Sequence, residues 1–161
     1  MAMDKQELKK DRLRYTKNKT SANLTYLAIL FDVLYFVEIY SSDVNNYYYT
    51  ITIGVSVVYN LMFLLIAFLS SEDLKKYKLS YAYAVIAIGI MQIVRILGIP
   101  KAAHSTFTTI DGMDVLVMDD KQYMYVIVCL VVSAAAAVAA GLVGIYKSTT
   151  LTKYMKEKGL E

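Results

Sequence analysis

The sequence has very little cysteine, proline or tryptophan, with one Cys, one Pro and no Trp among 161 residues. A single Cys cannot form a disulfide within the chain, which excludes a secreted module held together by its own cysteines. Charge is also scarce in four long apolar blocks, because 16 of 17 Lys and Arg and 12 of 14 Asp and Glu lie outside them. A water-soluble domain would distribute its charges along amphipathic elements. The pattern therefore predicts an integral membrane protein.

The four apolar blocks cover residues 22–40, 50–69, 79–99 and 123–146. An α-helix rises about 1.5 Å per residue, so each block is long enough to cross a hydrocarbon layer roughly 30 Å thick. Helix is expected because lipid offers no hydrogen-bond partner to a free backbone group. We predict an all-α fold with a four-helix transmembrane domain over 22–146.

Lys and Arg are concentrated in alternate segments between these blocks. Segments 1–21, 70–78 and 147–161 contain 14 of them, and the two remaining connectors contain two. Cytoplasmic segments of membrane proteins carry this excess, so both termini are predicted to be cytoplasmic. The protein would then be a multi-pass protein of the plasma membrane. The 14 Lys against three Arg are typical of an AT-rich genome and favour a bacterial origin.

The charged segment 1–21 and the tail 147–161 flank the transmembrane domain. The first has acidic and basic residues at helical spacing and could form a helix. Its basic residues would either bind anionic lipid or only fix the topology, and we favour the second interpretation. The tail has apolar residues at helical spacing and is expected to lie along the inner membrane surface.

The connector between the third and fourth blocks contains a hairpin signal at 105–118. Two β-prone runs flank Asp111-Gly112, a pair that tolerates the positive φ of a type I′ turn. A two-residue turn sets the register, which would pair Ile110 with Met113, Thr108 with Val115, and Phe107 with Leu116. An isolated hairpin is marginal in water, so this one should cover the helix ends or contact a partner. We favour the first role, in which the hairpin covers the helix ends.

Three charged residues lie inside the predicted spans: Asp32, Glu38 and Arg95. A charge in a span is costly, so it normally has a partner or faces water. By helical rise Glu38 and Arg95 lie near the same outer height, and an ion pair between them is the simplest arrangement. Glu38 could equally reach the interface alone.

Asp32 lies deeper, about 12 Å from the outer end of its span. Asn60 and Gln92 fall within about one helical turn of that depth, and Gln92 shares a helix face with Arg95. We predict a polar seam formed by Asp32, Asn60, Gln92, Arg95 and, at its outer end, Glu38. In a wet seam Asp32 would be a cation or proton site. In a dry seam it would be paired with Arg95 or be neutral and hydrogen-bonded, and we leave both interpretations open.

The fourth span contains two rows of small residues at four-residue spacing. The rows are Ser133, Ala137 and Gly141, and beside them Ala136, Ala140 and Gly144. Small side chains let helix backbones approach closely in lipid. These rows therefore predict close helix packing, within the chain in preference to a homodimer or another protein.

No catalytic pattern accompanies these features, and we do not expect an enzyme. His104 has no nearby Cys or second His, so neither a metal nor another cofactor is predicted. Nucleic-acid signatures are missing, and the bilayer is the one expected partner besides a homo-oligomer or another membrane protein. Two functions remain: a non-enzymatic subunit or accessory protein acting through helix packing and the hairpin, or an oligomeric transporter or channel for ions or small solutes that uses the seam around Asp32. We favour the first slightly.

Overall fold

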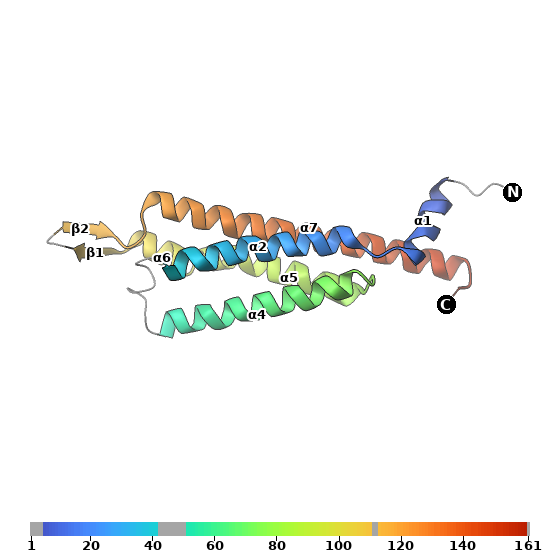
Figure 1. Cartoon of the computed structure of the whole chain (residues 1–161), viewed down its shortest axis with the longest axis horizontal. Helices are drawn as coiled ribbons and strands as arrows, with labels where there is room; N and C mark the ends of the chain where they lie inside the picture. Colours follow the sequence, from blue (N-terminus) through green and yellow to red (C-terminus); the bar gives the residue numbers. More distant parts are fainter. Residues whose placement is uncertain (1–4, 42–50, 111–112, 161) are drawn as a thin grey trace.

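The computed structural model describes residues 5–41, 51–110 and 113–160 as an elongated helical bundle with a small hairpin at one end (Figure 1). The helices, in chain order, are α1 (Lys5–Tyr15), α2 (Lys19–Ser41), α4 (Ile51–Leu74), α5 (Leu79–Ile96), α6 (Ile99–Ser105) and α7 (Asp120–Glu157). Strands β1 (Phe107–Ile110) and β2 (Met113–Leu116) lie between α6 and α7.

Four of these helical segments are long and apolar enough to cross a membrane, which confirms the predicted number of spans. They are Lys19–Tyr40, Gly54–Leu74, Leu79–Ser105 and Asp120–Glu157. Their outward-facing surfaces carry many exposed Leu, Val, Ile and Met side chains. A water-soluble protein would not expose so much contiguous apolar surface.

The bundle is organised around α7, which packs along both α2 and α5 (Figure 1). With 38 residues, α7 is roughly 57 Å long at the usual helical rise, well beyond a hydrocarbon layer about 30 Å thick. The predicted tail, 147–161, continues this helix as far as Glu157. Lys147 and Ser148 end the apolar run without ending the helix.

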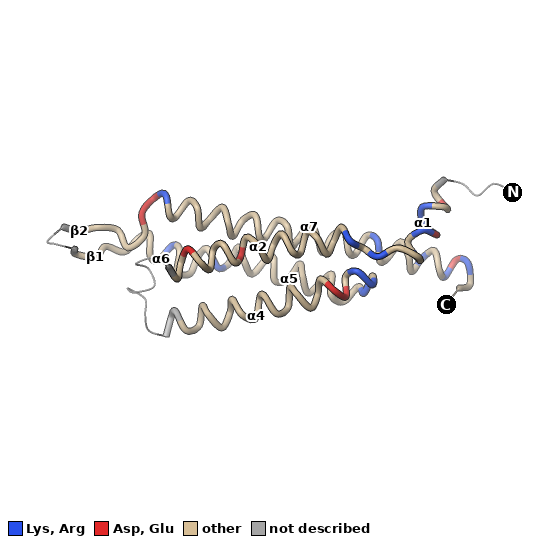
Figure 2. Tube along the Cα trace, in the orientation of Figure 1, with Lys and Arg blue, Asp and Glu red and all other residues tan. Residues whose placement is uncertain are grey.

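The N-terminal charged segment forms its own helix, α1, which packs against the far end of α7. Tyr154 donates a hydrogen bond to Asp11, and Lys158 donates one to Glu7 over 3.2 Å. The carboxylate of Glu7 raises the pKa of Lys158 above its ordinary value. The α4–α5 turn lies towards the same end of the molecule, and most Lys and Arg residues are concentrated there (Figure 2).

The third predicted span, 79–99, is not one continuous helix. Helix α5 stops at Ile96, and Gly98 separates it from α6, which carries Pro100 in its first turn. Pro is compatible with the start of a helix because its missing N–H would be unsatisfied there anyway. Ser105 consequently belongs to α6, and the hairpin is shorter than the predicted 105–118.

The hairpin itself has the predicted register. Phe107 pairs with Leu116, Thr108 with Val115, and Ile110 with Met113 in an antiparallel two-stranded sheet. The predicted turn residues, 111 and 112, lie outside the described residues. The hairpin extends past the ends of the long helices, with α6 at its base (Figure 1).

Candidate functional site

The polar centre of the bundle is an ion pair between Asp32 of α2 and Arg95 of α5. Arg95 Nη1 donates to Asp32 Oδ1 over 2.9 Å, and Gln92 Nε2 donates to the same oxygen over 2.8 Å. Exposure is 9% for the Arg95 side chain and zero for that of Asp32. In a low-dielectric interior such a pair persists only when further hydrogen bonds support it. Gln92 supplies that support.

A fourth residue, Ser133 of α7, extends this network to the third helix. Gln92 Nε2 lies 3.4 Å from Ser133 Oγ, and the Ser133 hydroxyl donates to the backbone carbonyl of Ala28 over 2.8 Å. All four side chains are therefore connected across α2, α5 and α7. The sequence assigned Ser133 only to the small-residue face, and its polar role could not be separated from that packing role.

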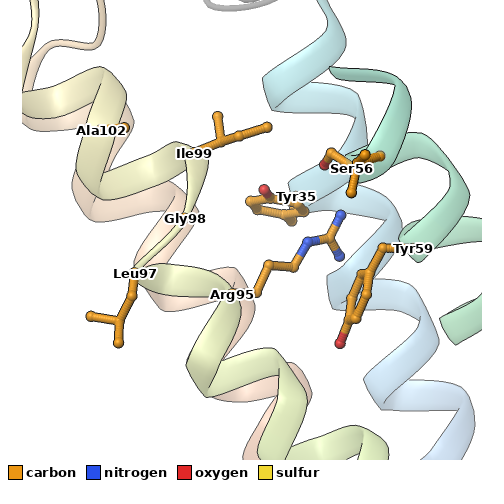
Figure 3. Close-up of a pocket in the computed structure, with 9 residues that line it drawn as sticks. Tyr35, Ser56, Tyr59, Arg95, Leu97, Gly98, Ile99 and Ala102 are labelled. Atoms are coloured by element: carbon orange, nitrogen blue, oxygen red, sulfur yellow. The ribbon is translucent and has the colours of Figure 1, made fainter. Parts of the chain in front are cut away.

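Two tyrosines enclose the Arg95 guanidinium. Its Cζ lies 4.3 Å from the Tyr35 ring centroid and 4.9 Å from that of Tyr59, so both rings act as cation–π partners (Figure 3). Tyr35 follows Asp32 by three residues and so shares its helix face. That spacing was a signal available in the sequence. Tyr59 carried no such signal, because its position depends on how α4 packs.

Beside Arg95 lies a cavity of about 440 Å³ between α2, α4 and the α5–α6 break. Figure 3 shows Arg95 reaching between the two rings towards Ser56. The residues lining the cavity are mostly apolar: Tyr35, Val55, Ser56, Tyr59, Arg95, Leu97, Gly98, Ile99 and Ala102. Asp32 is not among them. The cavity therefore reaches the cation of the pair and not its carboxylate.

The remaining members of the predicted seam lie apart from this network. Glu38 forms no ion pair with Arg95 among the described residues, and the predicted Glu38–Arg95 pair is wrong. Its carboxylate is instead close enough to Tyr125 and Cys129 of α7 to interact with them electrostatically. Asn60 is buried, and its Oδ1 has no hydrogen-bond partner in the described part of the chain.

The six small residues of the predicted packing face are all buried within the chain: Ser133, Ala136, Ala137, Ala140, Gly141 and Gly144. The space around the two glycines is the tightest. A Cβ on Gly141 would lie 2.4 Å from Ile86 Cγ1 of α5, and one on Gly144 would lie 2.9 Å from Leu74 Cδ2 of α4. This face is therefore occupied by the chain's own helices.

A second polar network lies at the end of the bundle where Lys and Arg are concentrated. Lys147 Nζ donates to Asn18 Oδ1 over 3.0 Å, and the backbone N–H of Asn18 donates to the Lys75 carbonyl over 3.1 Å. Hydrogen bonding to Glu72 raises the pKa of Lys75. Ser148 donates to the Tyr77 carbonyl in the α4–α5 turn. These contacts tie the turn, the start of α2 and the extension of α7 together.

Among residues 5–41, 51–110 and 113–160, no group of three or more His, Cys, Asp or Glu side chains is placed to hold a metal ion. Comparison with protein-family models, with curated proteins and with solved structures found no match to this chain.

Proposed function

We propose that this chain is a non-enzymatic, multi-pass protein of the bacterial plasma membrane that acts as a structural or accessory subunit. Its termini and the α4–α5 turn would lie in the cytoplasm and its hairpin outside. The orientation is supported by the gathering of Lys and Arg at one end of the bundle (Figure 2). The subunit role is supported above all by the hairpin.

The hairpin presents apolar side chains that the described helices leave uncovered. Phe107 is 63% exposed and Val115 is 44% exposed, and cross-strand pairing places them on opposite faces of the two-stranded sheet. Isolated two-stranded sheets are marginal in water, and their unpaired edges invite pairing with another strand. A partner at this position would stabilise the hairpin.

A second copy of the same chain is the partner that we propose. The bilayer fixes the height of every copy, so two hairpins in one membrane lie at the same level. Identical edges and faces can then meet around a two-fold axis, which is the usual symmetry of homo-oligomers. A different membrane protein would have to present a complementary segment at that height.

Disulfide trapping tests this assembly. In a Cys129→Ala background, Val115→Cys should form a disulfide-linked dimer in native membranes after mild oxidation. Leu142→Cys is the matched control, because Leu142 is an apolar residue on the outer face of α7 that is at least as exposed as Val115, and this variant should remain monomeric. Equal cross-linking of the two variants, or none at Val115→Cys, would refute the homodimer.

The proposed orientation has its own test. A membrane-impermeant maleimide added to intact cells should label Val115→Cys and leave Lys158→Cys unlabelled until the membrane is opened. Labelling of Lys158→Cys in intact cells would contradict the orientation.

The alternative function, an oligomeric ion- or small-solute transporter that uses Asp32, receives less support from the geometry. Asp32 is fully buried, and one of its oxygens accepts hydrogen bonds from both Arg95 and Gln92. A translocated cation would have to displace Arg95 from the carboxylate. In proteoliposomes we therefore expect no pH-coupled flux, and flux that disappears in Asp32→Asn would favour the transporter instead.

A further inference from the structure

The cavity beside Arg95 has the size and lining of a small-molecule site. Its volume of about 440 Å³ lies within the roughly 300–1,000 Å³ typical of such sites, which are mostly apolar with a few placed polar groups. Here the polar residues of the lining are Arg95, Ser56, Tyr35 and Tyr59. This cavity is independent of the hairpin on which the proposed function rests.

Arg95 retains hydrogen-bonding capacity beyond its pair with Asp32. Its Nη1 donates to Asp32 and Gln92, while Nη2 is buried without a partner in the described structure. A buried donor on a charged group that makes no hydrogen bond is costly, so a ligand oxygen there would be favourable. The buried Tyr35 hydroxyl also has no hydrogen-bond partner.

The charge distribution selects an acceptor that carries negative charge. Asp32 binds the guanidinium from the side away from the cavity, since Arg95 lines the cavity and Asp32 does not. The pair therefore presents its positive end to the cavity. A carboxylate is the natural partner of a guanidinium that still has free N–H groups.

The route into the cavity indicates where the ligand comes from. Two lining residues, Val55 and Leu97, are 63% and 66% exposed on the apolar surface of the bundle. The cavity is therefore bordered by the apolar surface of the bundle, which faces lipid in a membrane. Arg95 lies one residue from the end of α5, and the candidate span continues beyond it through α6 to Ser105. An amphiphile in the surrounding leaflet would bring its head to Arg95 and place its alkyl chain against the apolar rim.

We propose that this cavity binds the carboxylate head of a single-chain amphiphile, such as a fatty acid, that enters from the lipid. The α5–α6 break makes the site possible, because a continuous helix through Leu97 and Gly98 would leave no such recess beside Arg95. The Tyr35 and Tyr59 rings hold the guanidinium in place while its free edge meets the carboxylate.

A tryptophan reporter tests the proposal, because the chain has no Trp of its own. Leu97→Trp places the fluorophore at the cavity rim, and the variant is reconstituted into phosphatidylcholine vesicles. Dibromostearic acid at low mole fraction should quench it with an apparent affinity about tenfold higher than that of its methyl ester, as expected for one charge-assisted hydrogen bond. Equal quenching by the acid and the ester would overturn the proposal.

Cavity-filling variants show whether the acid binds in the cavity. Ser56→Phe, from α4, and Ala102→Phe, from α6, should each reduce quenching by the acid to the level of the ester. The matched control is Val58→Phe, two residues from Ser56 but on the lipid-facing surface, which should change nothing. If one filling variant fails to fold by circular dichroism, the other decides. Unchanged preference for the acid in a folded filling variant would refute this site.

Discussion

Replacing Arg95 with Leu should destabilise the bundle by about 3–5 kcal/mol, the cost typical of removing one member of a buried ion pair. The variant leaves Asp32 fully buried with a hydrogen bond from Gln92 alone. It also removes the cation between the Tyr35 and Tyr59 rings. The free energy of unfolding in mixed detergent micelles, measured by titration with a denaturing detergent, provides the readout.

Two further variants separate the ion pair from simple loss of a long side chain. Asp32→Leu combined with Arg95→Leu should recover most of the lost stability, because an apolar pair of similar volume removes both desolvation costs. Glu38→Gln is the matched control: it also neutralises a charge within α2, but Glu38 has no ion pair in the described structure. A loss for Glu38→Gln as large as that for Arg95→Leu would contradict the special role of the Asp32–Arg95 pair.

The sequence predicted the number of long helices well, because hydrocarbon permits few alternatives. A run of about twenty uncharged apolar residues has to be a helix in lipid, and the hairpin register followed from Asp111-Gly112 and the flanking alternation. Hydropathy alone did not predict where helices end. It continued the third span across the break at Gly98 and stopped the fourth at Tyr146, although α7 continues to Glu157.

The partner of Arg95 could not be predicted by counting residues along the helices. Counting along helices gives the height of a residue in the membrane and says nothing of the direction in which it points. Asp32 and Glu38 are six residues apart, about 1.7 helical turns, so they lie on different faces of α2. Packing of α2 and α5 against their shared neighbours α7 and α4 brings Asp32 to Arg95 and leaves Glu38 near Cys129. The tyrosines around Arg95 likewise depend on packing.

Gly141→Ala should also destabilise the protein, although it adds a single methyl group. The new Cβ would lie 2.4 Å from Ile86 Cγ1 and 2.7 Å from the Ala82 carbonyl oxygen, so α7 and α5 would have to separate. Overpacking of this kind costs typically about 1–3 kcal/mol and sometimes more. In lipid the effect is direct, because close contact between backbones is a main source of helix association.

Gly54→Ala is the matched control for this prediction, since it is the same substitution in another membrane-spanning helix. A Cβ on Gly54 would meet nothing within 4 Å, so the change should be neutral or should add up to about 1 kcal/mol through helix propensity. Ile86→Ala in the Gly141→Ala background should restore only part of the stability. It removes the side-chain clash, while the clash with the Ala82 backbone remains. Equal unfolding free energies for Gly141→Ala and Gly54→Ala would mean that α5 and α7 do not pack through these small residues.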